Sequence, residues 1–199
     1  MITPKLKIIA DGAILALANT TKFNQKLNHQ TNWTYREFND FILNVNKDCL
    51  IVFNTVWDNE WAFQFLINEE SDQLYFRKFE QSIEITNNEL HLINWTELTS
   101  ALQFKNTTIP DQSNKDLKID LDNGFYKVIV KQISDPDHYE DFNNHPLNFI
   151  VELSIQPENP NIKADEIVWT KDFPNDDSPF LSDQPNEFDE FLGTLLSRN

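Results

Sequence analysis

The chain has 199 residues, of which 40% are hydrophobic and 13% aromatic, enough for one sizeable domain with an apolar core. Its 32 acidic and 16 basic residues give a formal net charge of −16, which argues against nucleic-acid and anionic-membrane binding. The same charge favours association with a basic protein, and solubility alone is the alternative explanation. Three glycines and one cysteine leave no basis for a glycine-rich phosphate loop or an internal disulfide.

The first 44 residues predict two strands and a helix. Residues 6–18 indicate strand, turn and strand, with the turn at Asp11-Gly12. This segment also resembles a signal peptide, but Asp11 interrupts its apolar run, so a cytoplasmic protein is expected. Residues 34–44 predict a helix, because Thr34 and Glu37 have capping-box spacing and the apolar side chains fall on one face.

The middle of the chain reads as short strands separated by turns. Asn87-Asn88 and the stretch 122–124 are typical of tight hairpins. Because no helical pattern separates consecutive strands, we expect a mainly β fold, an antiparallel β-sandwich of about ten short strands. The strands after the first helix are expected at 49–55, 60–67, 73–78, 82–86, 89–93, 117–121, 124–133, 148–155 and 166–170.

The C-terminal part predicts an acidic extension. The sequence divides into a β-sandwich domain, 1–155, and an extension, 156–199, within what is expected to be a single domain overall. Apolar residues at helical spacing predict an amphipathic helix at 185–198 that packs on the sandwich. Its acidic first turns suit the positive end of the helix dipole.

The stretch DFPNDDSPFL, residues 172–181, keeps charges that the helix does not explain. Three acids and Phe180 lie there on a loop stiffened by proline, with a further acid at the expected helix N-cap. We expect a partner-binding surface in this region. Its residues are Asp172, Asp176, Asp177, Phe180 and Asp183.

Two tryptophans flank a polar turn between apolar strands. Trp57 and Trp61 could close the end of the sandwich core, with each indole N–H near water. The alternative is that both belong to the partner-binding surface, where aromatic residues serve as anchors.

Catalytic and metal-binding patterns are weak. The four histidines lack metal-ligand spacing, and the acidic loop 134–145 lacks the ligand order and turn glycine of a calcium-binding EF-hand. Cys49 opens an apolar run and is expected to be buried. We therefore expect no enzyme, no metal and no cofactor, although a carbohydrate-binding sandwich using the tryptophans stays open.

Several segments together resemble a known bacterial β-sandwich family. In chain order they are TTKFNQ (20–25), NWT (32–34), LIVFNTVWDNEWAFQF (50–65), ELHLINWTELTSALQF (89–104) and LDNGFYKVIVKQI (121–133). Over residues 14–155 the chain resembles the competence-associated DNA-entry nuclease inhibitors and related toxin-immunity proteins. The resemblance implies a non-enzymatic cytosolic inhibitor of a nuclease or toxin.

These observations lead to one functional hypothesis. The chain is expected to be an immunity or antitoxin-like protein that binds and inhibits a basic effector, a nuclease, through an acidic surface. An accessory structural domain or a carbohydrate-binding domain without a toxin partner is the alternative.

Overall fold

The computed structural model describes residues 4–27, 41, 48–136, 146–165 and 167–170. The chain divides into two compact units, Met1–Val168 and Trp169–Asn199, and all the strands and helices described belong to the first unit. The helix expected at 34–44, apart from Phe41, lies outside the described residues, as do the expected C-terminal helix and the residues from Asp172 to Asp183. Among the described helices, none is long and apolar enough to cross a membrane.

Five strands form the larger sheet. Three of its four pairings are antiparallel, and the pairing of β4 with β9 is parallel. In spatial order the strands are β1 (Lys5–Ala10), β4 (Asn59–Ile67), β9 (Phe149–Gln156), β8 (Gly124–Gln132) and β5 (Arg77–Ile85).

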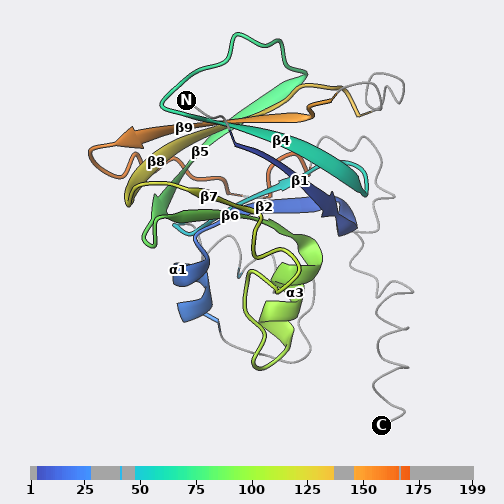
Figure 1. Ribbon diagram of the computed structural model, residues 1–199, viewed down its shortest axis with the longest axis vertical. Coiled ribbons are helices and arrows are strands. Elements are labelled where there is room, and N and C mark those ends of the chain that lie inside the picture. The colour runs from blue at the N-terminus through green and yellow to red at the C-terminus, as the bar shows by residue number, and fades with distance from the viewer. Residues whose placement is uncertain (1–3, 28–40, 42–47, 137–145, 166, 171–199) are drawn as a thin grey trace. The chain divides into compact units, whose positions relative to one another are not determined.

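Four antiparallel strands form the smaller sheet. In spatial order they are β3 (Leu50–Asn54), β2 (Ile14–Ala18), β6 (Glu89–Asn94) and β7 (Lys118–Asp120). The short turn η1 (Asp11–Ala13) joins β1 to β2, and the helices are α1 (Thr20–Gln25) and α3 (Trp95–Gln103). Figure 1 shows the two sheets as stacked layers, with α1 and α3 on the far side of the smaller sheet. The predicted mainly β sandwich is confirmed.

Aromatic side chains fill the space between the two sheets. The rings of Phe63 and Phe149 stack with centroids 4.7 Å apart, and Phe53 of the smaller sheet lies 5.8 Å from Phe149. All three are fully buried. Each ring contributes a large apolar area, so this stack is the centre of the core between the sheets.

The smaller sheet is covered on both faces, because the helices pack on its second face. There Ala16, Val52 and Ile93 form a cluster with Leu98 and Leu102 of α3. Every residue of β2 and β3 is consequently buried, which explains why both strands are continuous apolar runs.

Two expected strands are wrong in detail. Residues 73–76 are not a strand, and β5 begins only at Arg77. The physical reason is that β4 and β5 are separated in the sheet by β9 and β8, so the intervening chain must cross those strands instead of pairing with a neighbour. Of the strand expected at 166–170, the structure describes residues 167–170, and among these only Val168 makes an isolated bridge, to Phe53.

Helix α3 was not predicted from the sequence. It begins with a complete capping box, in which Asn94 accepts from the backbone N–H of Glu97 and Glu97 accepts from that of Asn94. The carboxylate of Glu97 also accepts from the backbone N–H of Asp111 and from Asn114 Nδ2, at 2.9 and 2.8 Å. Glu97 therefore joins the loop after α3 to the start of that helix.

The first unit continues beyond β9. Ser82 on the edge strand β5 donates its backbone N–H to the carbonyl of Ile162 at 2.8 Å, and Lys163 Nζ donates to the carbonyl of Ser82. These bonds cover part of the edge of the larger sheet. The expected division at residue 155 stays a prediction, because most of the extension lies outside the described residues.

Candidate functional site

The turn between β3 and β4, residues 55–58, holds its backbone in a strained conformation. Val56 has φ of 76°, a region that β-branched residues rarely adopt. Such a conformation costs on the order of 1–3 kcal/mol and persists only when surrounding bonds enforce it. One such bond runs from the Val56 N–H to Asn54 Oδ1, at 2.7 Å.

Further hydrogen bonds fix Trp57 at the tip of this turn. Its carbonyl accepts from Thr55 Oγ1 at 3.1 Å and from Trp61 Nε1 at 3.3 Å, and its indole N–H donates to the carbonyl of Pro136 at 3.1 Å. The Trp57 residue is nevertheless 54% exposed. Both backbone and ring are thus held in place while much of the residue faces solvent.

A second turn supports the first. The Ala13 N–H of η1 donates to Asp58 Oδ1 at 2.5 Å, and the Thr55 N–H donates to the carbonyl of Ala13 at 2.7 Å. Asp11 Oδ1 in turn accepts from the backbone N–H of Thr96 at the start of α3, at 3.2 Å. The turn before β2, the turn after β3 and the beginning of α3 therefore form one hydrogen-bonded assembly.

The two tryptophans proposed from the sequence have different environments. Trp61 is fully buried, and its ring meets the ring of Phe149 at 5.2 Å in an edge-on contact. It belongs to the core and holds Trp57 through the indole hydrogen bond. In this structure a partner could contact Trp57 but not Trp61.

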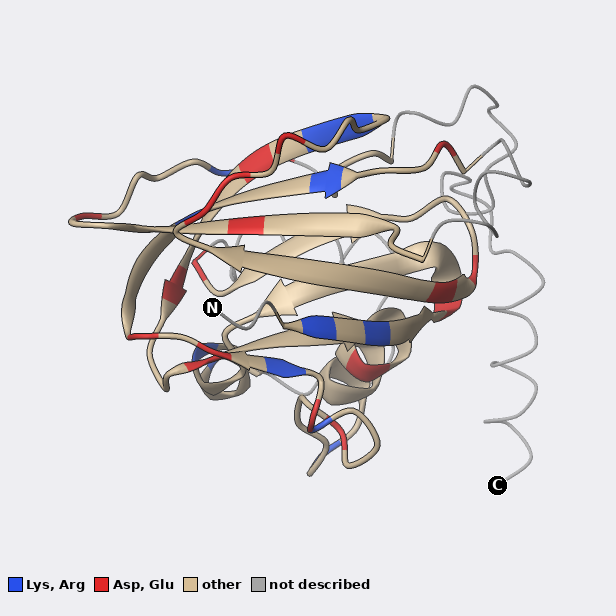
Figure 2. Ribbon diagram, turned by 45° about the horizontal axis from the view of Figure 1, so that its top comes forward, with Lys and Arg blue, Asp and Glu red and all other residues tan. Residues whose placement is uncertain are grey.

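The described strands do not form a uniformly acidic face. Figure 2 shows basic and acidic residues interspersed over the larger sheet. The lysines of β1, β5 and β8 are Lys5, Lys7, Lys78, Lys127 and Lys131, and glutamates of β4, β5 and β9 lie among them. The expected acidic residues Asp172, Asp176, Asp177 and Asp183, with Phe180, lie outside the described residues.

Carboxylates do accompany the Trp57 turn. Asp58 follows Trp57 directly, and Asp135 precedes the proline whose carbonyl accepts the Trp57 indole N–H. An exposed aromatic ring whose neighbours along the chain include carboxylates suits a cationic side chain, which is attracted both by the ring face and by the negative charge.

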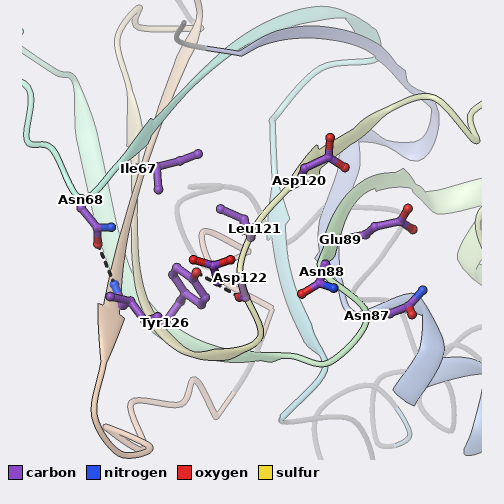
Figure 3. Close-up of a pocket in the computed structure, with 10 residues that line it drawn as sticks. Ile67, Asn68, Asn87, Asn88, Glu89, Asp120, Leu121, Asp122 and Tyr126 are labelled. Carbon is purple, nitrogen blue, oxygen red and sulfur yellow. Dashed lines mark hydrogen bonds between the residues drawn. The ribbon is translucent and has the colours of Figure 1, made fainter. Parts of the chain in front are cut away.

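A pocket of about 440 Å³ lies at the opposite end of β4 from Trp57. Figure 3 shows it between the ends of both sheets, and its carboxylates are Glu89, Asp120 and Asp122. Hydrogen bonding to Lys118 lowers the pKa of Glu89, which keeps that carboxylate charged. Tyr126 donates its hydroxyl to the carbonyl of Asp122 at 3.0 Å, and burial raises the pKa of this phenol.

Neither a reactive thiol nor a metal-ligand cluster is found in the described part of the chain. Burial raises the pKa of the Cys49 thiol to about 11, so the thiol is protonated at neutral pH. The described residues contain no group of three or more His, Cys, Asp or Glu side chains placed to hold a metal ion.

Comparison with known proteins gives two structural matches. No family model matches the chain, and no curated protein is similar enough to match. ComJ from Bacillus subtilis, an inhibitor of the DNA-degrading activity of NucA, matches with a TM-score of 0.44 and 14% identity, covering 78% of this chain and all of ComJ. The protein of crocagin biosynthetic gene J matches with a TM-score of 0.48 and 12% identity, covering 78% of this chain and 99% of its own. The predicted resemblance is thus confirmed as a structural match, and it concerns the fold alone.

Proposed function

We propose that this chain is a non-enzymatic, cytoplasmic inhibitor that binds a basic effector protein, a nuclease, with Trp57 as an anchor. The observation that carries the proposal is the fixed position of this exposed ring. Half of the residue is open to solvent, although three hydrogen bonds and a strained neighbour hold it in place. A preorganised aromatic side chain loses little conformational entropy when a partner covers it.

The charge of the chain supports a basic partner. A net charge of −16 steers a cationic protein toward the surface and repels phosphates and anionic lipids. Nucleases need cationic clefts for their phosphate substrates, so the positive charge of such a cleft is complementary to the negative charge of this chain. The guanidinium of an arginine in such a cleft can stack on Trp57 beside Asp58.

The acidic residues 172–183 remain part of the proposal. Asp172, Asp176 and Asp177 precede the helix expected at 185–198, so the dipole of that helix does not account for their charge, and Phe180 follows them in the sequence. In the proposed complex they add acidic contacts to the anchor at Trp57. Their contribution is expected mainly in the association rate, because exposed charges act at long range.

Carbohydrate binding receives less support. A sugar-binding platform made from both tryptophans would require Trp61 to leave the core, since it is fully buried. A single exposed ring remains, and no second aromatic residue on the described turn accompanies it.

The proposal is tested by capturing and then measuring the partner. The photo-cross-linking residue benzoylphenylalanine replaces Trp57 in producing cells, and a second strain carries it at Phe104, which is similarly exposed at 57%. A basic protein cross-linked only from position 57 is then purified and tested for nuclease activity with and without this chain. We expect inhibition by the wild type, and about 30-fold weaker binding by Trp57→Ala, as for an aromatic hot spot.

The control is Phe104→Ala, which removes an equally exposed ring elsewhere and should change the affinity less than about threefold. Equal loss in both variants, or a captured partner with neither positive charge nor nuclease activity, would contradict the proposed function.

A further inference from the structure

The loop between β4 and β5, residues 68–76, crosses one face of the larger sheet. In that sheet β9 and β8 lie between β4 and β5, so the loop must run over both strands to reach β5. It begins beside β9, where the Asn68 N–H donates to the carbonyl of Leu153, and ends beside β8, where the Phe76 N–H donates to that of Gln132. Figure 1 shows it above the sheet, and we call it the crossover loop.

A buried ion pair anchors the first half of the crossover loop. Lys131 of β8 and Glu152 of β9 form a 2.6 Å contact, and their side chains are only 9% and 3% exposed. Ser71 of the loop contacts both of them. Its N–H donates to Glu152 Oε1 at 2.8 Å, and its carbonyl accepts from Lys131 Nζ at 2.9 Å.

Cations hold the second half. The ring of Tyr75 lies 5.2 Å from Lys78 Nζ and 5.6 Å from Lys131 Nζ, and the guanidinium of Arg77 lies 5.9 Å from the ring of Phe76. Contacts of this kind are each worth on the order of 0.5–1 kcal/mol at exposed sites. The crossover loop is thus held to the sheet at Asn68, Ser71, Tyr75 and Phe76, although it has no regular secondary structure.

Three consecutive apolar residues of this pinned loop face solvent. Leu74 is 86% exposed, Tyr75 42% and Phe76 48%. Single exposed apolar side chains are common, but a contiguous group on a fixed loop marks an interaction surface. Because the backbone of the loop is already ordered, the loop loses little conformational entropy when a partner covers these side chains.

The charges next to this group favour a cationic partner over the other candidates. Glu69, Glu70 and Asp72 precede the apolar residues in the same loop and are exposed. Arg77 and Lys78 follow the apolar residues, but Arg77 donates to Gln132 Oε1 and to the carbonyl of Asn54, so the exposed carboxylates outnumber the exposed lysine. The net charge of −16 disfavours a second copy of this chain and an anionic lipid surface. A standard stable interface buries roughly 800 Å² per partner, so three side chains alone are too few to hold two copies of this chain together.

We infer that the crossover loop is a second docking surface for the basic protein partner. Leu74 and Phe76 form its apolar centre, and the three carboxylates form an acidic rim for lysine or arginine. The inference rests on the proposed function for the existence of that partner. It adds a surface distinct from the Trp57 turn, made by a different connection of the fold.

The test uses the protein captured by cross-linking from position 57. Benzoylphenylalanine is also placed at position 74, with Phe104 again as the control position, and the binding of purified Leu74→Ser/Phe76→Ser is measured by surface plasmon resonance. We expect cross-linking from 74 to the same protein and binding at least about 10-fold weaker. Phe104→Ser removes a similarly exposed ring, and the five residues that precede Phe104 include no acid. The affinity of this variant should stay within about twofold of the wild type.

A third variant separates rim from centre. Glu69→Gln/Glu70→Gln/Asp72→Asn should slow association and flatten its salt dependence, with little effect on dissociation. If the position-57 partner binds Leu74→Ser/Phe76→Ser as tightly as the wild type, the inference is overturned while the proposed function stands. If neither position 57 nor position 74 captures a basic protein, both are wrong.

Discussion

Replacing Lys131 by Met should destabilise the protein strongly, because it leaves a buried charge without its partner. Glu152 is 3% exposed, and it would keep the hydrogen bond from the Ser71 N–H but lose the one from the Lys131 ammonium. Removing one member of a buried ion pair costs about 3–5 kcal/mol. For a chain of this size that corresponds to a fall in melting temperature of roughly 6–20 °C.

Two matched variants separate burial from charge. Lys131→Met/Glu152→Met removes both charges and should recover most of the lost stability, because an apolar pair of similar volume replaces a buried ion pair at little cost. Lys7 and Glu60 form an equally short pair, at 2.7 Å, but their side chains are 66% and 54% exposed. Lys7→Met should therefore cost less than about 1 kcal/mol.

Urea unfolding followed by tryptophan fluorescence and circular dichroism gives the free energies, and amide exchange at Ser71 reports whether the crossover loop is released. We expect Lys131→Met to accelerate exchange at Ser71. Equal costs for Lys131→Met and Lys7→Met would refute this explanation, as would a double variant as unstable as Lys131→Met alone.

Two further predictions concern stability. Gly12 has φ of 66°, and a Cβ there would lie 2.8 Å from Trp95 Cδ1. Gly12→Ala should therefore lower the free energy of unfolding, measured with urea, by about 1–3 kcal/mol. An unchanged urea midpoint would contradict the tight approach. Burial lowers the pKa of His91 below its usual 6.5. The unfolded state therefore binds more protons than the folded state, and the free energy of unfolding should fall as the pH drops below about 6.5. His91→Gln should show a smaller fall between about pH 7.5 and 5.5, and an identical pH profile would exclude His91 as its source.

The sequence predicted the strands whose environment leaves a local signature. β2 and β3 are continuous apolar runs because both faces of the smaller sheet are covered, and β6 and β8 are bounded by clear turn signals. Residues 73–76 of the crossover loop belong to the strand predicted at 73–78, since Leu74, Tyr75 and Phe76 have strand-like composition. Only the order of strands in the sheet shows that this segment has no neighbour to pair with.

The different environments of the two tryptophans were only partly predictable. Trp61 alternates with Phe63 and Phe65 in β4, and this period of two already places it on the inward face. The exposure of Trp57 depends on the strained turn at Val56 and on bonds to η1 and Pro136, which are distant in sequence. No local pattern contains that information.

The proposed role of Trp57 as the anchor for a basic nuclease is tested most directly by the affinity of the captured partner for Trp57→Ala and Phe104→Ala at low and high salt. We predict about 30-fold weaker binding for Trp57→Ala alone, and slower association with the wild type as salt rises. Wild-type affinity in Trp57→Ala, with an association rate independent of salt, would contradict this role.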